Sequence, residues 1–161
     1  MEVEKKNNII DAVTLNELIK AQDKVLSEVI CYLWVNTINP KEPIDVIDAV
    51  EFVFSDGSKL ALTGNESQEG LTFIQYNFEE EKEHIEREFE GKIKIFKVKA
   101  NVTEMWKDVI NTKLTKVRLT KDKESEHYLC DEIVLEFENN EMRLIQVHPL
   151  DGVIIDYYEE V

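Results

Sequence analysis

The sequence predicts an α+β fold, predominantly antiparallel β, in which a unit of one helix and four strands occurs twice. Three observations support this prediction: short segments alternate apolar and polar residues, turn residues separate these segments, and similar residues recur just over 80 positions apart. The 161 residues are 43% hydrophobic and 33% charged, which suits a chain with a core. We divide the chain into a first unit at 1–78, a connector at 79–100 and a second unit at 101–161, together forming one compact domain.

The repeat is a weak self-similarity whose spacing drifts only within loops. Surface loops tolerate changes in length and strands do not, so this pattern is typical of a duplicated unit. A coincidence of short alternating strands is the alternative. The matched segments are Leu26–Val35 with Ile110–Leu119 (84 positions apart), Asp48–Phe54 with Asp131–Phe137 (83), Lys59–Leu62 with Glu141–Leu144 (82) and Gly70–Tyr76 with Gly152–Tyr158 (82).

Each unit begins with a predicted helix. In the first unit, Thr14 and Glu17 have the spacing of a capping box, in which two side chains satisfy exposed amide groups at a helix start. In the second unit, apolar residues at three- and four-residue spacings predict one face of a helix. These residues are Val102, Met105, Trp106 and Val109.

Four strands follow each helix, and the second and third strands form a tight hairpin. Asp56-Gly57 is a strong turn signal because both residues tolerate positive φ, and Asn139-Asn140 is its weaker counterpart. Each fourth strand is expected to start after a glycine, Gly70 or Gly152, where the chain can turn at little steric cost. The apolar residues expected on the inner face of the second strands are Val50, Phe52 and Phe54 in one unit and Ile133, Leu135 and Phe137 in the other.

The connector is predicted to contain an acidic helix and a lysine-rich strand. Asn77 and Glu80 form a second capping-box candidate, and the helix should run to about Glu90, before Gly91. Lys92–Lys99 alternates lysine with apolar residues, and lysines on one face of a strand suit a sheet edge that resists pairing with other chains. A basic docking strip is the alternative.

Several apolar residues are expected on the outer faces of the hairpins, opposite the main apolar set. Either a second layer covers them, or some of them form an exposed patch used for binding. These residues are Val53, Ile74, Val134, Ile145 and Ile154.

A few polar residues are candidates for ligand or cation binding. Asp48, with Asp45 before the same strand and Asp131 at the equivalent place, could ligate a hard cation, although an Asp before a strand is often a turn residue bonded to its own backbone. His148 and Asp151 lie close together and could form a general acid–base pair, or simply belong to a loop.

Several classes of protein are disfavoured. A formal charge of −15 repels nucleic-acid phosphates and anionic lipid, so neither is an expected partner. The sequence has no membrane-length apolar run, no signal-peptide pattern, and no metal, cofactor or nucleophile motif. We therefore expect no metal, no cofactor and a cytoplasmic protein. Cys31 and Cys130 are expected to be buried small apolar residues, with a thiol pair as the alternative.

The leading functional prediction is a non-catalytic binding protein whose acidic surface neutralises a basic protein. Bacterial immunity proteins, which inhibit basic nucleases, share this size and charge, but no motif in the chain specifies them. One alternative is a small-ligand-binding protein or enzyme with a pocket between the units, using Asp48, Asp131, His148 or Asp151. Another is a homo-oligomeric structural protein. A monomer and a homodimer are both compatible with the sequence.

The acidity is spread evenly along the chain. Residues 1–78 carry 6 basic and 13 acidic residues, a net −7, and residues 101–161 carry 7 and 14, again −7. The connector carries 6 and 7, a net −1, with its acids in the predicted helix and most of its lysines in the strand. Solubility alone would explain such a distribution, so charge favours a cationic partner without specifying one.

Overall fold

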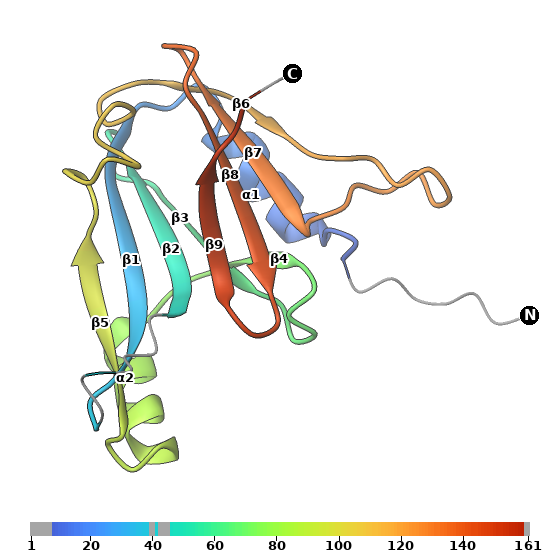
Figure 1. Ribbon diagram of the computed structural model, residues 1–161. Coiled ribbons are helices and arrows are strands. Elements are labelled where there is room, and N and C mark those ends of the chain that lie inside the picture. Colours follow the sequence, from blue (N-terminus) through green and yellow to red (C-terminus); the bar gives the residue numbers. More distant parts are fainter. Residues whose placement is uncertain (1–7, 39–40, 42–45, 160–161) are drawn as a thin grey trace, which may run out of the picture.

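The protein has the α+β class that the sequence predicts, with a mostly antiparallel sheet and two helices (Figure 1). The computed structural model describes residues 8–38, 41 and 46–159. Asp45, one of the candidate cation ligands, lies outside the described residues. The elements are α1 (Ala12–Ala21), β1 (Leu26–Asn36), β2 (Val46–Phe54), β3 (Lys59–Gly64), β4 (Leu71–Ile74), α2 (Phe78–Glu88), β5 (Ile93–Lys99), β6 (Leu114–Arg118), β7 (Glu132–Phe137), β8 (Met142–His148) and β9 (Gly152–Tyr157).

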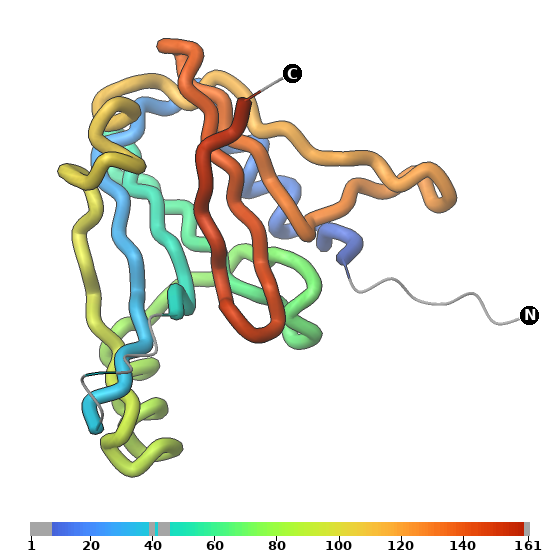
Figure 2. Tube along the Cα trace, viewed as in Figure 1, coloured from blue at the N-terminus to red at the C-terminus, as the bar shows by residue number. Residues whose placement is uncertain are grey.

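The strands form two antiparallel meanders that belong to one hydrogen-bonded sheet. The first meander is β1 to β4, with β5 added beside β1, and the second is β6 to β9. Short contacts join them: Ile47 of β2 pairs with Val153 of β9, Val25 pairs with Lys113 just before β1 and β6, and the Leu71 N–H of β4 donates to the Cys130 carbonyl before β7. The sheet therefore bends, and the two meanders enclose a common interior, as the Cα trace in Figure 2 shows.

The main core lies between the two meanders. Val50, Phe52 and Phe54 of β2 belong to the same buried cluster as Ile133, Leu135 and Phe137 of β7, which confirms the inner faces expected from alternation. Leu18 and Ala21 of α1 and Trp106 also belong to the cluster, and the Phe52 and Trp106 rings meet edge to face with centroids 5.5 Å apart. Burying large apolar side chains of this kind contributes about 1.5 to 3 kcal/mol each.

A second, smaller core lies on the other face of the first meander, beneath α2. Ile85 of α2 is buried against Ile30, Tyr32 and Ala49, and Ile95 of β5 completes the buried set. Val53, Tyr76, Phe78 and Phe89 pack around this group. The outer face of this meander is therefore covered at Val53. This agrees with the expectation of a second layer there, and not with that of an exposed binding patch.

The first helix begins earlier than the sequence pattern indicated. Its N-cap is Asp11, whose carboxylate accepts hydrogen bonds from the Thr14 backbone N–H at 2.7 Å and from the Thr14 hydroxyl at 2.9 Å. Thr14 is fully buried, and its Oγ1 accepts the Phe73 backbone N–H at 2.9 Å. The capping box expected at Thr14 and Glu17 is wrong because the Thr14 hydroxyl connects α1 to β4 instead.

The helix expected at the start of the second unit is not formed. Residues 101–111 make a series of turns in which Trp106 and Val109 are buried and Val102 is 88% exposed. The chain must leave helical geometry here because the Asn111 backbone N–H donates to the Leu26 carbonyl at 2.7 Å, in the contact that joins β6 to β1. Apolar spacing alone does not distinguish a helix from turns that bury the same residues.

The connector helix agrees well with its sequence signals. Asn77 is the N-cap of α2, and its side chain accepts the Glu80 backbone N–H at 3.2 Å. The strand that follows, β5, pairs with β1 alone and is an edge strand. Its lysines occupy both faces, however, because the alternation of lysine and apolar residues changes phase between Ile95 and Phe96. Phe96 is 47% exposed.

One predicted outer-face residue lies in the core. Ile145 is fully buried, because β8 pairs with β7 so that Ile145 lies opposite Ile133. A one-residue shift in register exchanges the two faces of a strand. The sequence match aligns Leu62 with Leu144. In the sheet, Leu62 lies opposite Val50 and Ile145 lies opposite Ile133, so the residue in the position of Leu62 is Ile145, one residue later.

The two central hairpins have the same local geometry. In the first hairpin the Phe54 N–H donates to the Ser58 carbonyl, and the Gly57 N–H donates to the Phe54 carbonyl. In the second, the Phe137 N–H donates to the Glu141 carbonyl, and the Asn140 N–H donates to the Phe137 carbonyl. Gly57 and Asn140 have positive φ of 88° and 68°. Leu26 of β1 and Leu114 of β6 each pair with the last residue of the following strand, Phe54 or Phe137, and a bulge follows each pairing.

Candidate functional site

Two tyrosine–carboxylate pairs lie side by side on the face of the first meander that α2 covers. The Tyr32 hydroxyl of β1 donates to Glu51 Oε1 at 3.1 Å, and the Tyr76 hydroxyl donates to Asp48 Oδ2 at 3.0 Å. The two rings stack with centroids 4.0 Å apart. Glu51 is only 6% exposed, so these bonds compensate carboxylates removed from water.

A bulge in β2 places Asp48 at this position. Tyr32 pairs with Ala49 and Leu33 pairs with Ile47, so Asp48 is an extra residue between two paired positions. A bulge re-aims a side chain without ending the strand. The carboxylate of Asp48 thereby reaches Tyr76, which follows β4.

Burial shifts the acid–base properties of this cluster. It raises the pKa of Asp48, and the hydrogen bond from Tyr76 offsets only part of that increase. Burial also raises the pKa of Tyr32 and of Tyr76, and the adjacent carboxylates Glu51 and Asp48 raise each further. Both tyrosines are therefore hydroxyl donors at neutral pH, and the Asp48 carboxyl accepts a proton more readily than an exposed aspartate does.

The Tyr32–Glu51 pair borders an open groove of about 920 Å³ beside the start of α2. We call it the acidic groove, because four of its lining residues are glutamates and two are lysines. Four aromatic side chains form part of its wall. The lining residues are Glu17, Tyr32, Glu51, Lys59, Ala61, Phe73, Ile74, Gln75, Tyr76, Asn77, Phe78, Glu79, Glu80 and Lys97.

A second hollow of about 350 Å³ lies where the first meander, the end of α2 and the β8–β9 turn meet. We call it the junction cavity. Its wall is mainly apolar, and Asp48 is its one acidic residue; the Asp48–Tyr76 hydrogen bond connects it to the acidic groove. The lining residues are Trp34, Val46, Ile47, Asp48, Gly64, Gln68, Phe89, Ile93, Pro149, Leu150, Gly152 and Val153.

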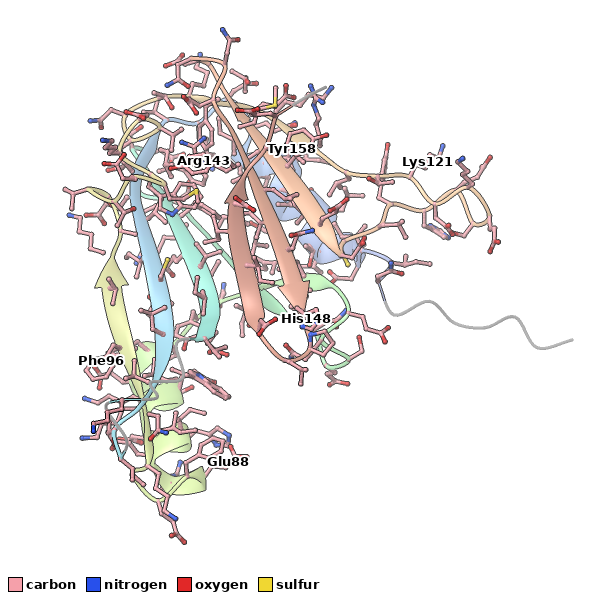
Figure 3. All side chains as sticks on the ribbon, in the orientation of Figure 1. Glu88, Phe96, Lys121, Arg143, His148 and Tyr158 are labelled. Atoms are coloured by element: carbon pink, nitrogen blue, oxygen red, sulfur yellow. The ribbon has the colours of Figure 1, made fainter. Side chains whose placement is uncertain are left out.

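The predicted pair of His148 and Asp151 forms, but on the surface. His148 Nδ1 lies 3.3 Å from Asp151 Oδ2, and the side chains are 51% and 68% exposed. Figure 3 shows His148 at the end of β8, apart from Glu88 on α2. Neither residue lines the acidic groove or the junction cavity, although their neighbours Pro149 and Leu150 line the cavity. The pair is therefore open to solvent and lies outside both hollows.

The remaining predicted residues are dispersed. Asp131 is half-buried before β7 and lines neither hollow, so the structure does not bring it to Asp48. Val134 is only 9% exposed, and Ile154 is half-buried. With Ile145 in the core and Val53 packed under α2, these four apolar residues do not make one exposed patch.

Sequence reasoning missed three residues of this region. Glu51 carried a usable signal, since an acidic residue between apolar strand neighbours requires a buried partner. Tyr32 and Tyr76 carried none, because their carboxylate partners depend on the pairing of β1 with β2 and on the bulge at Asp48. Within the described chain, no three His, Cys, Asp or Glu side chains converge as metal ligands would.

Comparison with known proteins adds no assignment. No protein family, curated protein or solved structure matches the chain. Of the two helices in the described part of the chain, neither has the length and apolar character needed to cross a bilayer.

Proposed function

We propose that the protein is a non-catalytic binding protein that neutralises a basic protein, and that the acidic groove and the adjoining face of α2 receive the partner. The observation that carries this proposal is the composition of the groove: glutamates from two helices meet aromatic side chains around one open hollow. Glu17 comes from α1, while Glu79 and Glu80 come from the first turn of α2.

The chemistry of the groove suits an arginine or lysine side chain. A guanidinium or ammonium group over an aromatic face, flanked by carboxylates, gains both cation–π and charge-assisted hydrogen-bond energy. A favourable helix dipole explains acidic residues at the start of α2, but it does not explain Glu17. Lys59 and Lys97 also line the groove, so a partner must avoid them, which would contribute to selectivity.

The wider surface of α2 supports the same partner chemistry. Between Glu79 and Glu90 there are seven glutamates against Lys82 and Arg87, a local charge of −5. The helix is held to the sheet chiefly by Phe78, Ile85 and Phe89, which leaves Glu83, Glu88 and Glu90 exposed. Such a field raises association rates with a cationic protein and falls with ionic strength.

We also propose that the two meanders descend from one duplicated unit. The repeated hydrogen bonds of the two central turns and the bulge after Leu26 and after Leu114 support this. A reducing compartment such as the cytoplasm is the proposed location. Support comes from Cys31 and Cys130, which are buried free thiols whose pKa burial raises to about 11 in each case.

Affinity capture from a lysate of the source organism, washed first at low and then at high salt, tests the proposal. We expect a basic protein to be retained at low salt and released at high salt, and mass spectrometry identifies it. The captured basic protein, once purified, should then bind this protein directly. Capture of no basic protein, or retention that does not respond to salt, would contradict the proposal.

A further inference from the structure

The junction cavity forms where β2 meets β9, through the pairing of Ile47 with Val153. Gly152 permits this close approach: its φ is +72°, and a Cβ there would lie 2.6 Å from the Ile47 carbonyl oxygen and 2.7 Å from Val46 Cγ1. Three separate parts of the chain thus supply the walls. The cavity is a product of tertiary packing rather than a dimple within one element.

The wall combines an apolar surface with a half-buried acid, Asp48. Asp48 uses Oδ2 to accept the Tyr76 hydroxyl, and within the described residues no lysine or arginine forms an ion pair with it. Trp34 adds a buried indole Nε1 that has no hydrogen-bond partner among the described residues. A half-buried carboxylate without a paired cation carries a desolvation cost that a cationic ligand can relieve.

We propose that the junction cavity binds a small organic amine with a compact apolar or aromatic body. The ammonium group would pair with Asp48, and the body would lie against Trp34 and Phe89, whose rings meet edge to face at 5.9 Å. Leu150, which is 83% exposed, lies at the rim and would close over the ligand. About 350 Å³ is at the lower end of the size range of small-molecule pockets, which favours a small ligand.

Charge decides between ligand classes. A carboxylate ligand of the same shape would meet the Asp48 carboxylate at short range in a poorly hydrated space, which is unfavourable. A neutral hydrocarbon would leave that carboxylate unpaired. This site is separate from the proposed contact with a basic protein, and either can fail without the other.

Titration with 2-phenylethylamine, followed through the two indole N–H signals in an NMR spectrum, tests the proposal. We expect the Trp34 signal to shift at millimolar amine and the signal of buried Trp106 to stay in place, with a Trp34→Phe variant making the assignment. The matched probe 3-phenylpropionate should cause no shift. An unmoved Trp34 signal, or equal responses to both probes, would overturn the proposal.

Variants locate the amine. Asp48→Asn keeps an acceptor for Tyr76 and should weaken amine binding about tenfold, the usual effect of losing a hydrogen bond to a charged group. Asp131→Asn removes the same charge away from the cavity and should leave binding unchanged. Leu150→Lys, at an exposed position, should also weaken binding by placing a competing cation at the rim. Undiminished binding in either cavity variant would contradict the site.

Discussion

Arg143 illustrates how a single residue can connect elements that are distant in sequence. It is 1% exposed, and its Nε donates to the Met105 carbonyl at 2.6 Å while Nη1 donates to Glu141 Oε2 at 2.8 Å. Its guanidinium also lies 4.7 Å from the centre of the Tyr157 ring. These contacts hold residues 101–111 against β8. The sequence suggested a helix for these residues, but they form turns. Nothing in the alternating pattern of β8 distinguishes this arginine from an exposed one.

Asp48 gives a prediction at the same scale. Its pKa is raised in the folded protein above the unfolded value of about 3.9. Between those two values the folded chain holds a proton that the unfolded chain has released, so this group lowers the free energy of unfolding as pH rises. We expect Asp48→Asn to be more stable than the wild type at pH 7, and the difference to disappear below about pH 4.

Urea unfolding at pH 7 and at acidic pH measures this difference. Comparing variant with wild type at each pH cancels the contributions of Asp11 and Asp56, whose lowered pKa values act with the opposite sign. A variant that is less stable at pH 7 would show that Asp48 is stabilised as a carboxylate. A difference that does not depend on pH would show that folding does not raise the pKa of Asp48.

At the scale of elements, the accuracy of the sequence predictions depended on whether the determining contacts were local. The start of α2 at Asn77, the hairpin after Phe54 and the inner face of β2 depend on near neighbours, and all three are confirmed. The turns at 101–111 and the register of β8 depend on partners elsewhere in the chain, and both predictions there were wrong. The candidate site shows the same dependence on distant contacts. Of the polar residues in its two tyrosine–carboxylate pairs, only Asp48 was predicted from the sequence.

The cap of α1 provides a prediction about an element. Asp11 accepts hydrogen bonds from Thr14 and, at 3.0 Å, from the Thr72 hydroxyl, so it both begins the helix and attaches it to β4. Partial burial alone would raise the Asp11 pKa, but these hydrogen bonds outweigh it and lower the pKa. Asp11→Ala should reduce the free energy of unfolding by about 1 to 2 kcal/mol, and Asp11→Asn, which can still cap the helix, by less. Equal losses in chemical unfolding would argue against the capping role.

At the scale of the molecule, the two meanders depend on narrow contacts, and Gly152 lies at one of them. Gly152→Ala adds both left-handed strain, about 1 to 2 kcal/mol, and a Cβ that collides with β2. Gly57→Ala is the matched control, because Gly57 has φ of +88° and no atom within 4 Å of an added Cβ. We expect the larger loss of thermal stability at Gly152. Equal losses of thermal stability in the two variants would mean that the contact between β2 and β9 accommodates the added Cβ without destabilising the protein.

The proposed binding of a basic protein in the acidic groove also involves the whole molecule. The most direct test measures the dissociation constant of the captured basic protein against salt concentration for three forms of the chain. These are the wild type, a groove variant with Glu17, Glu79 and Glu80 changed to Gln, and a control variant with Glu66, Glu126 and Glu138 changed to Gln. Both variants remove three negative charges, and the control changes exposed glutamates outside the groove.

We expect the wild type and the control to bind comparably, with affinity falling steeply between low and moderate salt. The groove variant should bind about tenfold more weakly at low salt, as the loss of three charges at the protein surface predicts, and should depend less on salt. Equal weakening in the two variants would assign binding to overall charge rather than to the groove. Unchanged binding in the groove variant would show that the acidic groove does not receive the basic protein.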